Sequence, residues 1–162
     1  MTVRVKLDRK DFALLEALQE NGSRRLEELA QLVKLAPSSV HERLRRMERL
    51  GVIRGWTIQI DAASVGLGVL AYIGIDATKP CSALMRSLEA ISAIEECHSV
   101  AGELSMILKV RVADTSALLA LTERLRKIQG IERTETTIVL KTQLARPTAL
   151  GEIMREAQHA MS

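Results

Sequence analysis

Apolar residues recur at helical spacing in three stretches near the beginning of the chain. The stretches cover residues 8–20, 26–33 and 37–50, and each places its apolar side chains on one face. Asp8 stands where a carboxylate caps helix amides, and Pro37 stands at a first helical position, where proline is favoured. The pattern therefore predicts three short helices.

The loop between the second and third stretches is short enough for a helix-turn-helix. It spans residues 34–36, which places the third helix in the recognition position. Val40, Leu44 and Met47 share the inner face of that helix, and the opposite face is polar and rich in arginine. The alternating segment 52–60 is predicted to be extended and to form a wing or a tether.

Beyond Gly66 the apolar period changes to that of strands, and strands then alternate with helices. The order is βαββαβ, which is typical of a ferredoxin-like sandwich. Two helices then cover one face of the sheet and leave the other bare, so self-association is expected. The predicted strands are 69–76, 95–100, 104–112 and 134–140, and the predicted helices are 80–91 and 115–129.

Composition excludes some classes of protein. Of the 162 residues, 47% are hydrophobic but only 2% are aromatic, which disfavours a protein that stacks single-stranded bases on rings. No stretch approaches the roughly 20 apolar residues needed to cross a bilayer. The N-terminus carries charge where a secretory signal would be apolar. We therefore expect a cytoplasmic protein without a membrane partner, in which Cys81 and Cys97 are reduced.

Charge is distributed unevenly. The first 60 residues hold 12 Lys and Arg against 8 Asp and Glu, and the remaining residues hold 11 against 12. Such a surplus on a helix often forms only a solvated face, and here Glu42 and Glu48 are spaced to pair with Arg46 and Arg45. The position of this arginine-rich helix directly after a tight turn favours DNA contact instead. The candidate DNA-binding residues are Ser38, Ser39, His41, Glu42, Arg45, Arg46, Arg49 and Arg54.

Residues that could support catalysis are few. The three histidines lie in three different modules, and no metal-ligand spacing, phosphate-binding glycine loop or nucleophile elbow is present. Cys97 and His98 are adjacent on a predicted strand and should point to opposite faces, and Glu95 and Glu96 should diverge in the same way. We therefore expect no enzyme activity, no cofactor and no metal site.

An ordered series of short motifs resembles the Lrp/AsnC, or feast/famine, family of transcriptional regulators. The resemblance covers about residues 7–142. Each fragment is short, and the specificity lies in their order. The fragments are Leu7-Asp8, Asp11, Glu28-Leu29-Ala30, Leu35, Pro37-Ser38, Arg43, Leu50-Gly51-Val52-Ile53, Gly55-Trp56, Glu96-Cys97, Val100, Gly102 and Thr137-Ile138-Val139-Leu140-Lys141.

This resemblance implies an α+β protein in four parts. Residues 1–55 would form a winged helix-turn-helix that binds double-stranded DNA, 56–67 a linker strand or hinge, 68–146 a ferredoxin-like (RAM-type) effector-binding and oligomerisation domain, and 147–162 a C-terminal tail. The family forms homodimers that often join into tetramers or octamers, and binds a small effector, usually an amino acid, at dimer–dimer contacts. The implied effector-binding residues are Gly102, Glu103, Leu104, Ser105 and Thr136.

Three residues depart from the family pattern. Ser105 stands where the family commonly has Asp, so a hydroxyl replaces the carboxylate that would meet a ligand ammonium. Arg25 and Ala36 stand where the family caps its second and third helices with Ser or Thr. A missing cap of this kind costs about 1 kcal/mol.

Two other functions stay open at this point. Siroheme decarboxylases resemble the same architecture but depend on His and Tyr around the tetrapyrrole, and here the second half offers only Tyr72, His98 and His159. The other alternative is an oligomeric small-molecule sensor that does not bind DNA, against which the arginine-rich helix face argues.

Overall fold

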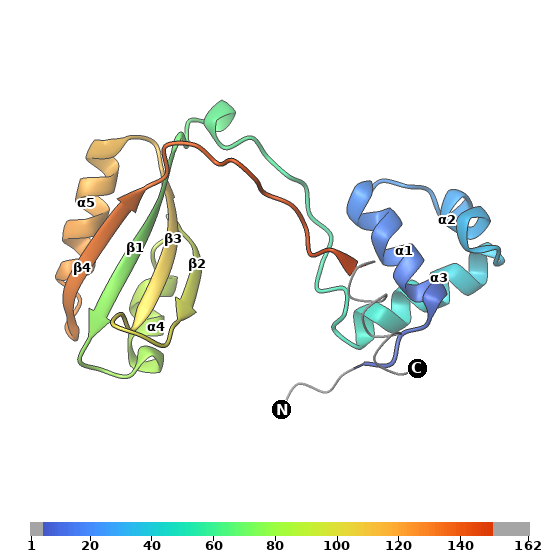
Figure 1. Cartoon of the computed structure of the whole chain (residues 1–162), viewed down its shortest axis with the longest axis horizontal. Coiled ribbons are helices and arrows are strands. Elements are labelled where there is room, and N and C mark those ends of the chain that lie inside the picture. The colour runs from blue at the N-terminus through green and yellow to red at the C-terminus, as the bar shows by residue number, and fades with distance from the viewer. Residues whose placement is uncertain (1–4, 151–162) are drawn as a thin grey trace. The chain divides into compact units, whose positions relative to one another are not determined.

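The computed structural model describes residues 5–150, which build two units around separate apolar cores (Figure 1). Of these residues, one unit contains 5–58 and 145–150, and the other is Gln59–Leu144. The four functional parts expected from the sequence stay a prediction. Most of the C-terminal tail expected at 147–162 lies outside the described residues.

The first unit consists of the three predicted helices: α1 (Arg9–Glu20), α2 (Leu26–Val33) and α3 (Pro37–Arg49). Its core is aliphatic, and Leu14, Val40 and Met47 are fully buried. Asp8 caps α1 as expected, because its Oδ1 accepts the N–H groups of Lys10 and Asp11 at 2.9 Å each. Gly51 ends α3 in the left-handed region, with φ of 69°.

The segment after α3 supports the tether and not the wing. Residues 54–60 contain no strand, and the structure gives them no ladder partner within the described chain. Ile58 and Ile60 are accordingly exposed. A wing needs a second strand to satisfy its backbone groups, and residues 5–53 have only helices and loops to offer.

The second unit has the predicted βαββαβ order, with a short 3₁₀ turn (Ala63–Val65) before it. The four strands form one antiparallel sheet in the order β2-β3-β1-β4, as in a ferredoxin-like fold (Figure 1). The elements are β1 (Val69–Ala77), α4 (Cys81–Glu89), β2 (Ile94–Ser99), β3 (Met106–Val112), α5 (Thr115–Arg126) and β4 (Ile131–Ile138).

Helices α4 and α5 cover one face of this sheet. Ile73 and Ile75 of β1 and Leu108 of β3 are fully buried against Leu88 of α4 and Leu125 of α5. No described element of the unit covers the other face, where Tyr72 is 41% exposed at the centre of the sheet. We call this second surface the bare face. Across the described residues, no helix is long and apolar enough to span a membrane.

The last strand begins and ends earlier than its apolar pattern predicts. It starts at Ile131 instead of Thr134, because α5 stops at Arg126 and the chain reverses at Gly130, whose φ is 107°. The sequence pattern missed this start because residues 132–137 are polar and mostly exposed along one edge of the sheet.

Candidate nucleic-acid interface

The outer face of α3 carries most of the predicted DNA-binding residues, and all of those on that face are exposed. The helix turns about 100° per residue, so positions opposite Val40 and Met47 point away from the core. Arg54 is also exposed but lies in the extended segment after the helix. The exposed residues on α3 are Ser38, Ser39, His41, Glu42, Arg45 and Arg49.

Arg45 and Arg49 are available to an external anion. Arg45 is exposed and has no ion-pair partner in the part of the chain that the structure describes. Arg49 pairs with Glu42 at 3.0 Å, but both side chains are more than 60% exposed. An exposed pair of this kind is worth less than about 1 kcal/mol, so a phosphate can replace Glu42 at little cost.

Arg46 is placed differently, because both of its terminal nitrogens bind groups of the same unit. Nη1 lies 3.2 Å from Oδ2 of Asp11, and Nη2 donates to the Lys6 carbonyl at 2.8 Å. The expected pairs of Glu42 with Arg46 and of Glu48 with Arg45 do not form. Glu48 instead accepts the indole N–H of Trp56 at 2.9 Å.

Arg43, which the candidate set omits, completes a network with Arg46. Its Nη1 lies 2.7 Å from both Asp8 Oδ2 and Asp11 Oδ1. Both carboxylates hold the pKa of Arg43 above its ordinary value. Partial burial acts to raise the pKa of Asp8, but hydrogen bonds from the Asp11 amide and from Arg43 outweigh it and lower that pKa. Local spacing carries no signal for this contact, because 35 and 32 residues separate Arg43 from Asp8 and Asp11.

These side chains surround one shallow hollow on the first unit. It exposes hydroxyls and guanidinium groups next to two carboxylates that are both paired with arginine, which suits contact with a polar, anionic surface. The lining residues are Asp8, Ser38, Ser39, Glu42, Arg43 and Arg46.

The loop before β3 contains four of the five predicted effector-binding residues. Gly102 and Glu103 are exposed, and Gly102 has φ of 148°. Leu104 packs over Gly74 of β1, where a Cβ would meet its Cδ1 at 2.6 Å. Ser105 turns its hydroxyl to the end of β1, and its Oγ accepts the Ala77 N–H at 3.1 Å.

Thr136, the fifth of these residues, lies on the other side of the sheet. It pairs with Ile73, whose side chain is buried under the helices, whereas Leu104 covers the neighbouring Gly74 on the bare face. One chain therefore does not bring Thr136 together with the loop residues.

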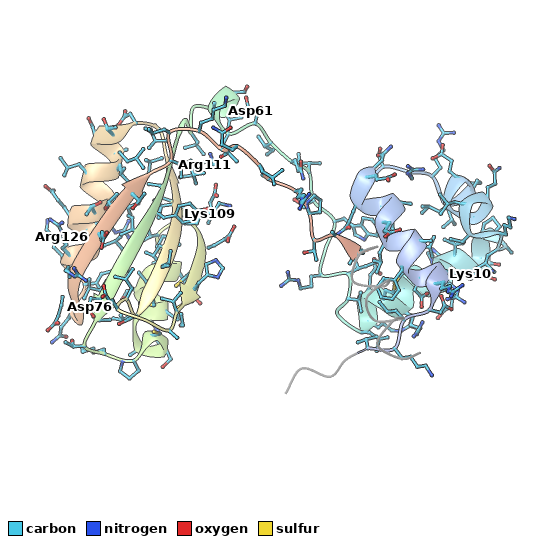
Figure 2. All side chains as sticks on the ribbon, viewed as in Figure 1. Lys10, Asp61, Asp76, Lys109, Arg111 and Arg126 are labelled. Carbon is cyan, nitrogen blue, oxygen red and sulfur yellow. The ribbon has the colours of Figure 1, made fainter. Side chains whose placement is uncertain are left out.

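A bulge in β2 corrects the expectation that Glu95 and Glu96 diverge. The register shifts between Ile94 and Glu96, and this places both carboxylates on Lys109, at 3.2 and 2.7 Å. Arg111 binds Glu95 at 2.6 Å. In Figure 2, Lys109 and Arg111 mark this cluster on β3, and Arg126 of α5 lies across the sheet from Lys109.

The charged cluster shifts the pKa values of its members. Burial acts to raise the pKa of Glu95, but hydrogen bonds from Arg111 and Lys109 outweigh it and lower that pKa. Lys109 and His98 lower the pKa of Glu96, and Glu96 in turn raises that of Lys109. The cluster is therefore an ion-pair network on the bare face and not an acid–base pair.

The two cysteines are free thiols, half-buried in the second unit. The Sγ of Cys97 lies 3.9 Å from the Sδ of Met85, and burial raises the pKa of its thiol. His98 faces Glu96 at 2.9 Å and not Cys97. Among the described residues, no three or more His, Cys, Asp or Glu side chains gather as metal ligands would.

Known protein families and known relatives match this chain over both of its units. Residues 7–48 match the family model of the AsnC-type helix-turn-helix domain, and residues 70–148 match that of the Lrp/AsnC ligand binding domain. The HTH-type transcriptional regulator LrpA of Mycobacterium tuberculosis is 40% identical over 84% of this chain and 91% of its own. The leucine-responsive regulatory protein of Escherichia coli K12 is 32% identical over 83% of this chain and 85% of its own.

A solved structure agrees with these sequence relatives. The feast or famine regulatory protein of M. tuberculosis, complexed with L-methionine, superimposes with a TM-score of 0.83 at 37% identity. The superposition covers 90% of this chain and 99% of that one.

Proposed function

Given that this chain belongs to the Lrp/AsnC family of transcriptional regulators, we propose that it reads double-stranded DNA with the outer face of α3. The relatives that it matches are regulators and not enzymes, so the siroheme decarboxylase alternative has no support among them. These relatives come from bacteria, whose chromosomes lie in the cytoplasm, so the proposal places this chain in the cytoplasm as well.

One observation carries this proposal: Arg45 stands exposed and without an ion-pair partner among the described residues on the helix that follows the turn. An arginine in the recognition helix can bind the O6 and N7 atoms of guanine in the major groove. Ser38, His41 and Arg49 flank it along the same exposed face and can reach phosphates or neighbouring bases.

The bare face supports self-association. A second copy that packs its own bare face on this one would bury Tyr72 and the apolar stem of Lys109. The resulting homodimer places two reading helices about a two-fold axis, so its site is a pseudo-palindrome. Tetramers or octamers built from such dimers would engage several sites at once.

An amino acid is the proposed effector, bound at the loop that holds Gly102, Glu103, Leu104 and Ser105. The support is the L-methionine complex of the M. tuberculosis relative and the match of this unit to a ligand-binding model. Ser105 already accepts the Ala77 N–H, so the exposed carboxylate of Glu103 is the loop's free partner for a ligand ammonium. Thr136 would take part only in an assembly that brings its side of the sheet to another copy's loop.

The Arg45→Ala variant tests the DNA-binding proposal. Genomic fragments that the wild-type chain selects supply the specific duplex, and a scrambled duplex of equal length supplies the nonspecific one. We expect a loss of about 1 to 3 kcal/mol on the selected duplex and much less on the scrambled one, measured by fluorescence anisotropy.

The matched control is Arg86→Ala, which removes the same charge from an exposed position on α4. It should bind both duplexes as the wild type does. Equal losses on the two duplexes for Arg45→Ala would reassign Arg45 to a phosphate contact. A wild-type chain that selects no fragment would favour the alternative of a sensor without DNA binding.

A further inference from the structure

The carboxylate of Asp11 lies where α1 and α3 meet, and it binds both helices. Its Oδ2 accepts the Asp8 N–H at 3.1 Å and so completes the cap of α1. Its two oxygens also accept Arg43 Nη1 at 2.7 Å and Arg46 Nη1 at 3.2 Å. The side chain is only 1% exposed, and a carboxylate buried to that extent needs charged partners.

The two arginines hold α3 at points that control its rotation. Arg43 and Arg46 are three residues apart and therefore lie on one side of the helix, facing α1. Burial of Val40 and Met47 determines which face of α3 turns toward the core, and hydrogen bonds to a fixed carboxylate restrict that rotation further because they are directional. Arg46 adds a further bond to the Lys6 carbonyl, in the segment that leads into α1.

We propose that Arg43 and Arg46 are positioning residues, which bind Asp11 and thereby fix the rotation of α3 about its own axis. Arg45 follows Arg43 by about 200° around the helix, so the direction of its guanidinium depends on this rotation. The inference rests on the proposed DNA-reading function, and it moves Arg46 from the expected base and phosphate contacts to the support of the helix.

Arg43 and Arg46 could contact phosphates or could position α3. Removing the charge of Asp11 separates these two roles because they predict opposite changes in DNA affinity. If Arg43 and Arg46 contact phosphates, an Asp11→Asn variant loosens both guanidinium groups, which keep only Asp8 and the Lys6 carbonyl as partners, and removes a repulsive charge, so DNA affinity rises. If they position α3, the same variant lets the helix turn, and the affinity for the selected duplex falls.

The experiment measures the full-length Asp11→Asn variant by fluorescence anisotropy over a range of salt concentrations. We expect affinity for the selected duplex to fall about tenfold and affinity for the scrambled duplex to change less than about twofold. The slope of log K against log salt should stay within about one unit of the wild-type slope, because no phosphate contact is lost. Asp11→Glu, which keeps the charge, should restore part of the specificity.

Two control variants separate positioning from charge and from stability. Glu20→Gln removes the same charge at the other end of α1, where Glu20 is exposed and pairs with Arg24. It should bind both duplexes as the wild type does. Val33→Ala removes core contacts of α2 without touching the network. Measured well below its unfolding temperature, it should keep the wild-type ratio of specific to nonspecific affinity.

A second variant keeps the test decisive if Asp11→Asn does not fold. Arg43→Lys retains the charge, but lysine is one bond shorter than arginine, so its ammonium falls short of the position from which Nη1 of Arg43 binds both Asp8 and Asp11. The inference predicts a lower specificity ratio with an unchanged salt slope for this variant.

Several results would overturn the inference. They are a rise or no change in specific affinity for Asp11→Asn, equal losses on both duplexes, or wild-type specificity in a folded Arg43→Lys chain. If the wild-type chain selects no duplex at all, the proposed DNA-reading function fails. If the wild-type chain selects a duplex and Asp11→Asn binds it equally well, only the positioning role fails.

Discussion

The two missing helix caps have different consequences at the level of single residues. At α2, the carboxylate of Glu28 accepts the Arg25 N–H at 3.2 Å and so satisfies a backbone donor at that end. At α3, Ala36 offers no side-chain acceptor, and only the fixed φ of Pro37 favours the first turn. The cost expected from the sequence therefore falls mainly on α3.

We expect Ala36→Ser to raise the free energy of unfolding of the first unit by about 1 kcal/mol, because a hydroxyl would accept a free amide of the first turn. Urea denaturation followed by the fluorescence of Trp56, the only tryptophan, reports on this unit. Ala120→Ser, at an exposed position in the middle of α5, is the control and should not raise the free energy of unfolding. A gain of equal size in both variants would point to an effect on the unfolded chain.

Single residues also show where sequence reasoning stops. The capping role of Asp8 follows from local spacing and is confirmed. The partners of Arg43 and Arg46 do not follow from it, since more than 30 residues separate these arginines from Asp8 and Asp11. Spacing along a helix predicts Glu42 as the partner of Arg46, but the buried carboxylate of Asp11 competes more strongly.

At the level of elements, helices and strands follow from apolar periodicity, but a strand irregularity does not. The period of two predicts opposite directions for Glu95 and Glu96. The bulge in β2 adds one residue to that strand, and both carboxylates then reach Lys109. No residue type in the stretch marks the bulge, because it depends on pairing with β3.

The contact between β1 and the loop before β3 depends on the absence of a side chain at Gly74. A Cβ there would lie 2.6 Å from Leu104 Cδ1. We expect Gly74→Ala to cost about 1 kcal/mol or less in stability, because the flexible end of Leu104 can move. Amino-acid binding, measured by calorimetry, should weaken more than stability does. Gly55→Ala, where a Cβ meets nothing within 4 Å, is the control. Equal amino-acid binding by the two variants would show that Leu104 does not belong to the effector site.

At the level of the whole molecule, the bare face determines what the second unit can assemble with. Tyr72 lies beside Lys109 of β3 and Thr137 of β4 at its centre, with the carboxylates of Glu95 and Glu96 next to Lys109. Family membership implies oligomers, and the mixed apolar and charged character of this face suits contact with a copy of itself.

We expect Tyr72→Asp to dissociate the proposed homodimer, because it adds a charge at the centre of the bare face near two carboxylates. Sedimentation velocity over a range of concentrations measures the change. Leu119→Asp makes a comparable substitution at an exposed apolar position of α5 and should leave the dimer intact. Dissociation by Leu119→Asp alone would place the dimer contact on the helix side of the sheet.

Each unit closes its own aliphatic core, so neither needs the other's side chains to complete its interior. Divergence in the operator-reading part can therefore proceed without compensating changes in the metabolite-sensing part. Recombination between two related genes at the codons for residues 54–60 would break no strand pairing. The product would combine the DNA target of one protein with the effector of the other.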